Sequence, residues 1–162
     1  MRAARAGCGT AVVVALFCGM AGAQEPKSSP AHLSTSNAGE SPTASALRKR
    51  AEASEAGDRA KLFAELSRLE VEEANSKFTA GDADGAQAEV ARATEDAQQA
   101  TQSSLNTHKR MKQTQMALHE VARRLDGIEH SLSAEDRAPV KKAVERVQGM
   151  ATELLEAMFK RK

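Results

Sequence analysis

An unbroken heptad stripe is the feature of this sequence that most restricts its fold. Counting from Ala86 to Leu132 in alternate steps of four and three meets no charged residue and no proline. The stripe consists of Ala86, Val90, Ala93, Ala97, Ala100, Ser104, Thr107, Met111, Thr114, Leu118, Val121, Leu125, Ile128 and Leu132. A helix with such a stripe buries it against neighbouring helices. The sequence therefore predicts an all-α fold around one long helix with a coiled-coil-like seam.

The continuity of this long helix is open to one objection. Residues 101–107 are mostly polar and poor helix formers, so a loop in that segment is the alternative. A loop normally resets the phase of the apolar pattern. Because the stripe passes through these residues without a slip, we expect one continuous helix.

Two further main helices are predicted to pack against the long one. From residue 46 onward the chain is rich in Ala, Glu, Arg, Lys and Leu, which favour helices. A first short helix is expected to stop at Gly57-Asp58, Gly81-Asp82 forms the next turn, and Ser133 starts the last helix through a capping box. The main helices are expected over about residues 58–80, 84–132 and 134–160. Short links make successive helices antiparallel, so residues 46–162 are predicted to form an elongated antiparallel bundle of three main helices.

The first 23 residues have the three zones of a secretory signal peptide. Arg2 and Arg5 precede an apolar run at residues 11–17, and Ala21-Gly22-Ala23 supplies the small side chains that signal peptidase requires. A membrane anchor is the alternative, but the run is shorter than the ~20 residues that span a bilayer. We therefore expect an exported protein, periplasmic or secreted, without a transmembrane helix in the mature chain.

The segments before the helical domain carry little chemistry. Both cysteines, Cys8 and Cys18, lie in the expected signal peptide, so the mature chain would have no thiol. Lipidation of Cys18 is the alternative to cleavage, and the bulky Phe17 disfavours it. Residues 24–45 are rich in proline and serine, which is typical of a disordered spacer.

Composition argues against a nucleic-acid partner. Removing Arg2 and Arg5 lowers the basic residues from 23 to 21 against 22 acidic residues, a net charge of −1 for the mature chain. Trp and Tyr are absent, so the chain has few aromatic platforms on which bases or sugars could stack. A protein partner or self-association is expected instead, with an anionic envelope component as the alternative for the basic residues near the end of the chain.

The titratable residues do not form a recognisable catalytic or metal site. His108, His119 and His130 are spaced by eleven residues and would line up on one helix face as a histidine ladder. Successive histidines would be about 16 Å apart, so they could not bind the same metal ion. Carboxylates such as Glu70 and Glu73 are typical of the solvent-exposed face of an amphipathic helix. We therefore expect no enzyme, no cofactor and no metal, and a pH-sensing role for the histidines is a secondary hypothesis.

One short stretch resembles part of a known repeat. In residues 74–82 the aromatic Phe78 precedes a Gly81-Asp82 turn, and the small residues Ala86 and Ala93 follow. This arrangement resembles the middle of a tetratricopeptide repeat over about residues 74–93, and the resemblance implies a helical hairpin with a binding-type ancestry. The layout as a whole also looks like that of uncharacterised exported bacterial helical proteins, which implies no activity.

The last predicted helix carries more apolar surface than one neighbour needs. Its end spreads apolar side chains over an arc of about 180°, wider than the ~100° stripe of a surface helix. The residues concerned are Met150, Leu154, Leu155, Met158 and Phe159, with Lys160 at the rim. Burial within the bundle is one interpretation, and a partner surface with adaptable Met side chains is the other.

The leading functional hypothesis is a non-enzymatic exported helical module with an interaction or structural role in the cell envelope. It rests on the strong seam and on the lack of a recognisable catalytic motif. A periplasmic holding chaperone or stress sensor that presents apolar helix surface is the alternative. A hydrolase or metal-dependent enzyme is the third hypothesis and has no motif in its favour.

Overall fold

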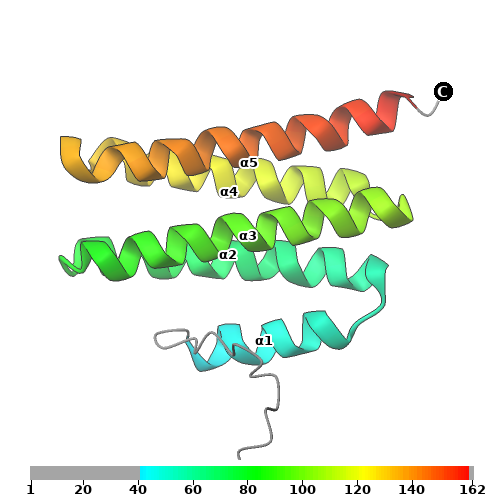
Figure 1. The fold of residues 1–162 in the computed structure, drawn as a ribbon, viewed down its shortest axis with the longest axis horizontal. Helices are drawn as coiled ribbons and strands as arrows, with labels where there is room; N and C mark the ends of the chain where they lie inside the picture. The colour runs from blue at the N-terminus through cyan, green and yellow to red at the C-terminus, as the bar shows by residue number, and fades with distance from the viewer. Residues whose placement is uncertain (1–40, 161–162) are drawn as a thin grey trace, which may run out of the picture. The chain divides into compact units, whose positions relative to one another are not determined.

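Five helices follow one another in the computed structural model, which describes residues 41–160 (Figure 1). They are α1 (Pro42–Ala53), α2 (Ala56–Thr79), α3 (Ala83–Thr107), α4 (Met111–Ser131) and α5 (Ala134–Lys160). No strand occurs in this range, so the all-α prediction is confirmed for it. The expected signal peptide at residues 1–23, and the expected spacer up to residue 40, lie outside the described residues.

The prediction of one continuous helix over residues 84–132 is wrong. α3 ends at Thr107 and α4 begins at Met111, because His108 and Arg110 take left-handed backbone conformations with φ of 54° and 57°. The hydroxyl oxygens of Ser104 and Thr114 are 2.7 Å apart across this turn. Ten residues would separate them by about 15 Å along a single helix, so the chain has reversed direction between them.

The heptad stripe is nevertheless buried along both helices. Of its positions from Ala86 to Leu132, only Thr107 and Leu132 are half-buried rather than buried. The periodicity therefore identified the buried face correctly, although it runs over two antiparallel helices and not one.

The N-terminal part of the bundle also departs from the prediction. α1 begins at Pro42, within the segment expected as spacer, and the Ser41 hydroxyl caps it by accepting from the Ala44 N–H at 3.2 Å. The break before α2 falls at Ser54 and Glu55, so Gly57-Asp58 lies inside the first turn of α2 instead of ending a helix. The structure thus has five helices in residues 41–160, where a short first helix and three main ones were expected.

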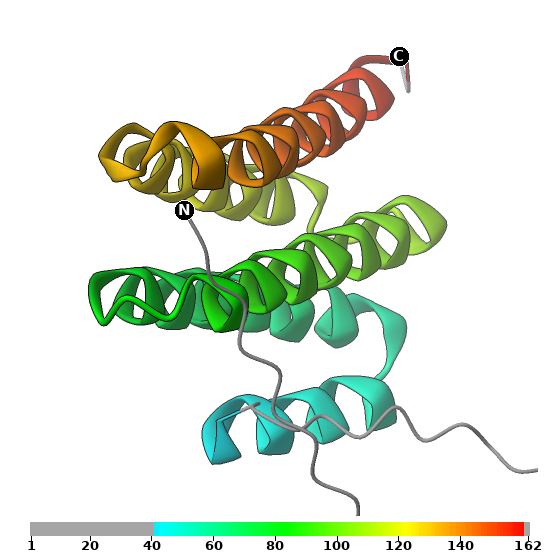
Figure 2. The ribbon, with the colours of Figure 1, turned by 60° about the vertical axis from the view of Figure 1, so that its left-hand side comes forward.

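Successive helices alternate in direction and form two hairpins, α2 with α3 and α4 with α5 (Figures 1 and 2). Gly81 (φ 82°) makes the turn of the first hairpin, and the Asp82 carboxylate caps α3 by accepting from the Gly85 N–H at 3.0 Å. Ser133 begins α5 by accepting from the Asp136 N–H at 3.4 Å. The hairpins pack with α2 along α4 and α3 along α5, and α1 packs on α2.

Two apolar clusters hold these helices together. The larger one joins α2, α3, α4 and α5 around Leu118, Leu125, Val147 and Leu154. The smaller one packs α1 against the first hairpin. It contains Ala44, Ala51, Leu62, Phe63, Ala64, Leu66 and Ala100. None of the helices in the described range has both the length and the apolar character to cross a bilayer.

Candidate functional site

The apolar side chains predicted to spread around the end of α5 form two groups in the structure. One group faces the core and the other is exposed. Met150 and Leu154 are buried, and the half-buried Met158 packs against the larger core cluster. Leu155 and Phe159 are 40% and 65% exposed, and Lys160 is exposed as well. Only the second group is accessible to a partner.

The exposure follows from the different lengths of α4 and α5. α5 has 27 residues and α4 has 21, and only a short turn joins them. About the last six residues of α5 therefore extend past the first residue of α4, which corresponds to roughly 9 Å of helix. Figure 1 shows α5 running past the start of α4. Leu155 and Phe159 lie in this extension four residues apart, so they share one helix face.

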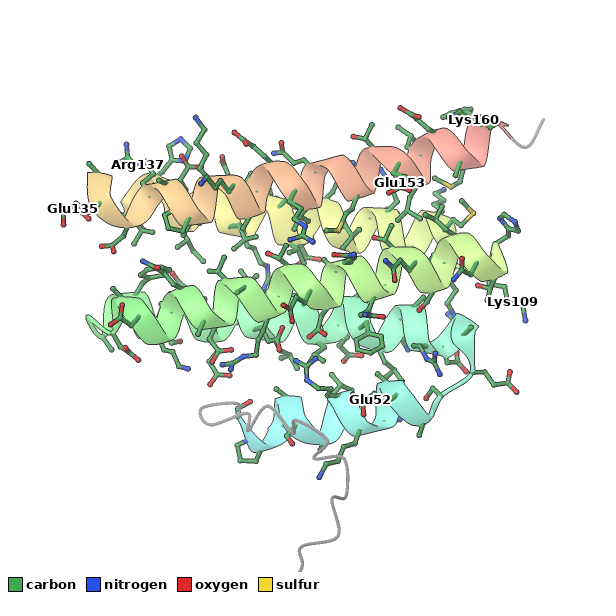
Figure 3. All side chains as sticks on the ribbon, viewed as in Figure 1. Glu52, Lys109, Glu135, Arg137, Glu153 and Lys160 are labelled. Carbon is green, nitrogen blue, oxygen red and sulfur yellow. The ribbon has the colours of Figure 1, made fainter. Side chains whose placement is uncertain are left out.

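Basic and acidic residues both lie at the end of the bundle where α5 ends. Figure 3 shows Lys109, in the α3–α4 turn, at the end where Lys160 lies. Arg110 pairs with Asp58 at 2.9 Å and Lys160 with Glu156 at 3.3 Å, whereas Lys109 and Lys112 have no ion pair within residues 41–160. We name Leu155, Phe159 and Lys160 the α5-end surface, and Lys109 lies apart from it, against Gly57 of α2.

A groove between α2 and α4 adjoins this end. It has a volume of about 450 Å³, and its floor contains Ala64 and Ala117. Lys61 and Arg68 line it without an ion pair in the part of the chain that is described, and Arg110 connects it to the α3–α4 turn. Glu65 and Glu120 also line the groove and offset part of the positive charge.

Sequence reasoning missed a buried ionic cluster that joins α1, α2 and α3. Arg48 donates from Nη1 to Asp96 Oδ1 at 2.7 Å and from Nη2 to Asp96 Oδ2 at 3.0 Å and Glu70 Oε1 at 2.6 Å. Glu70 is 0% exposed and Asp96 is 1% exposed. Burial raises the pKa of Glu70 to about 10, and the nearby negative charge of Asp96 adds to the rise.

The hydrogen bonds of this cluster link three helices to one another. Two adjacent carboxyl groups with different protonation states are a feature of acid–base enzymes, but here Arg48 occupies both oxygens of Asp96 and one oxygen of Glu70. A signal for Glu70 was present in the sequence, because it lies four residues after Leu66 and four before Ala74, within the apolar stripe of α2. The geometry indicates a structural role that fixes α1 to the first hairpin.

A second buried ionic cluster belongs to the α2–α3 hairpin alone. Glu89 is 0% exposed and accepts from Lys77 Nζ at 2.5 Å and from Arg92 Nε at 3.1 Å. Two cations therefore compensate one buried acid. This cluster also supports the fold and offers no free catalytic group.

The predicted histidine ladder is split by the break between α3 and α4. His108 lies in the turn, while His119 and His130 lie in α4, and all three are exposed. A hydrogen bond with the Asp126 backbone carbonyl raises the pKa of His130. No group of three or more His, Asp or Glu residues in the described range is arranged to hold a metal ion.

With the fold and these surfaces described, the chain can be compared with known proteins. No family model matches the sequence, and neither a curated protein nor a solved structure matches the chain.

Proposed function

We propose that this chain is a non-enzymatic, exported helical module of the cell envelope that works by binding, and that the α5-end surface is its binding site. The observation that carries the proposal is the pair Leu155 and Phe159, exposed four residues apart on an extension of α5 past the start of α4. Large exposed apolar side chains are commonly part of interaction sites when they gather in one place. Export rests on the three zones of residues 1–23.

The proposal is tested by changing both apolar residues. Leu155→Ser with Phe159→Ser removes exposed side chains, so far-UV circular dichroism and the melting temperature should stay close to the parent. Co-sedimentation with an envelope fraction should be lost. Met116→Ser is the matched control, because Met116 is 60% exposed but lies on α4 outside this surface. Envelope association that survives the double change would refute the proposal.

A holding chaperone is the second candidate. The packing of α1 on α2 favours it. Apart from the Arg48 hydrogen bonds, α1 covers Leu62, Phe63 and Leu66 only with Ala44, Leu47 and Ala51. Release of α1 would uncover this apolar surface for an unfolded client. The test is aggregation of reduced insulin with the parent or with a variant that lacks residues 42–53. A chaperone should suppress aggregation, and more strongly without α1.

A further inference from the structure

We propose that α1 is a detachable helix that covers the first hairpin, and that loss of a proton from the buried acid pair beneath it, Glu70 and Asp96, favours its release. This inference concerns a part of the molecule separate from the α5-end surface and goes beyond the proposed function. It adds a trigger to the release of α1 that the chaperone candidate requires. It combines three observations: the packing of α1, the contacts of Arg48, and the burial of the two acids.

α1 is the helix with the fewest neighbours in the bundle. Within residues 41–160 it packs along α2 only, whereas each of the other helices packs along at least two neighbours. Figures 1 and 2 show it on the side of the first hairpin that faces away from α4 and α5. The larger apolar cluster contains no residue of α1. The core formed by α2 to α5 would therefore stay complete if α1 left.

α1 contributes little apolar surface to this contact. Its buried residues are Ala44 and Ala51, and the half-buried Leu47 packs against the same cluster. A helix of 12 residues is marginally stable in water by itself. Ser54 and Glu55, which join α1 to α2, have extended backbone conformations and can act as a hinge. α1 therefore depends on its attachment to the hairpin and should unravel when it is released.

Arg48 attaches α1 to both acids. Its guanidinium nitrogens lie 2.6 Å from the Glu70 carboxyl group and 2.7 Å from the Asp96 carboxyl group, and neither acid is more than 1% exposed. Release of α1 withdraws the guanidinium, and water can then take its place at both carboxyl groups. The attachment of α1 and the hydration of these acids therefore exclude one another.

The surroundings of Glu70 couple its proton to the release. The charged groups around it are Arg48 of α1, Asp96 and Glu89 of α3, and the Lys77 and Arg92 side chains that bind Glu89. Burial is the largest cause of the raised pKa of Glu70, which is about 10, and the charge of Asp96 adds to the rise. Hydration after release lowers this pKa toward the ordinary value of 4.5.

The departure of Arg48 acts on the pKa of Glu70 in the opposite direction. Its positive charge lowers this pKa in the closed bundle, but it is a smaller cause than burial. The released state therefore binds the proton less tightly than the closed state. Release becomes more favourable as pH rises toward 10, by up to about tenfold for each pH unit.

Amide hydrogen exchange followed by mass spectrometry tests this inference at pH 6, 7 and 8. Protection factors are compared, because they remove the pH dependence of the exchange chemistry itself. The protection factor of α1 should be at least about tenfold below that of α4 at every pH, since local opening precedes global unfolding. In the parent protein it should fall by about 10- to 100-fold from pH 6 to pH 8.

Two pairs of variants separate the proton from the attachment. Glu70→Gln cannot lose a proton, so the protection factor of α1 should change less than about threefold from pH 6 to pH 8, whereas the exposed control Glu65→Gln should follow the parent. Arg48→Met should lower the protection factor of α1 at pH 6 by about 30-fold or more, because the buried acids lose their shared cation. Arg50→Met, which removes an exposed arginine from the same helix, should alter it less than about threefold.

Each part of the inference can fail by itself. If the amides of α1 were as protected as those of α4, α1 would leave only when the whole bundle unfolds, and its detachment would be overturned. A protection factor that does not fall with pH in the parent, or that falls equally in Glu70→Gln, would overturn the role of the proton. These measurements involve neither an envelope fraction nor a client, so the proposed function and the chaperone candidate are decided by their own tests.

Discussion

Arg48 on α1 and Glu70 on α2 are joined by a hydrogen bond of 2.6 Å, and the same guanidinium also binds both oxygens of Asp96 on α3. One side chain thus connects the first three helices. Because both carboxyl groups are buried, removing the arginine would leave them without this compensating charge.

The first prediction concerns Arg48→Met. The side chain of Arg48 is 20% exposed, so its removal should lower the free energy of unfolding by about 2 to 4 kcal/mol, near the lower end for a buried ion pair. Urea unfolding followed by circular dichroism measures this loss. Arg124→Met is the control, because it breaks the more exposed pair with Glu72 and should cost less than about 1 kcal/mol. Similar costs for both variants would contradict a structural role for the Arg48 cluster.

The second prediction concerns pH. The pKa of Glu70 is about 10 in the folded protein and near 4.5 in the unfolded chain, so between these values the folded state holds a proton that the unfolded state has lost. The contribution of Glu70 to stability is therefore complete below about pH 4.5 and declines as pH rises toward 10. Glu70→Gln keeps an acceptor for Arg48 but does not titrate. It should match the parent at pH 4 and be more stable than the parent at pH 8 by up to about 5 kcal/mol, since each pH unit above about 4.5 lowers the stability of the parent by up to about 1.4 kcal/mol.

Thermal melting at a series of pH values checks this prediction. The difference in melting temperature between Glu70→Gln and the parent should widen steadily from pH 5 to pH 9. Glu65→Gln removes an exposed carboxylate from the same helix and should follow the parent throughout. A constant difference across the pH range would show that Glu70 does not hold a proton in the folded protein.

The third prediction concerns the hydroxyl pair of Ser104 and Thr114. Both side chains are buried, so Ser104→Ala or Thr114→Val alone leaves one hydroxyl without its partner and should cost about 1 to 3 kcal/mol. The double variant should cost less than the sum of the single ones, by about 1 kcal/mol. Urea titrations of the four proteins measure this coupling. Strict additivity would mean that the two hydroxyls do not meet.

The same turn shows how far the sequence could predict the fold. A heptad stripe reports which residues are buried, and it identified Leu118, Leu125 and their neighbours. It does not report chain direction, because residues on both sides of a turn can face one core. The turn itself lacked the usual signal, since His108 and Arg110 occupy left-handed positions where glycine is the common residue.

The sequence predicted the candidate site only as one broad apolar face of the last helix, without separating buried from exposed side chains. Angular spacing placed Leu154 and Phe159 on one broad apolar surface, but it could not show where α4 begins and leaves the end of α5 uncovered. The ionic cluster escaped prediction for another reason. Charged residues on helices usually face water, and the proximity of Arg48, Glu70 and Asp96 depends on how three helices pack.

The last prediction uses glycine to distinguish a turn from a continuous helix. His108 is exposed and has φ of 54°, a conformation that glycine adopts without the strain caused by a Cβ atom. His108→Gly should therefore raise the free energy of unfolding by about 0.5 to 1 kcal/mol. His119→Gly is the matched control in the exposed interior of α4, where glycine should lower it by about 1 kcal/mol. Urea unfolding should give opposite signs for the two variants, because a continuous helix through residue 108 would make both glycines destabilising by similar amounts.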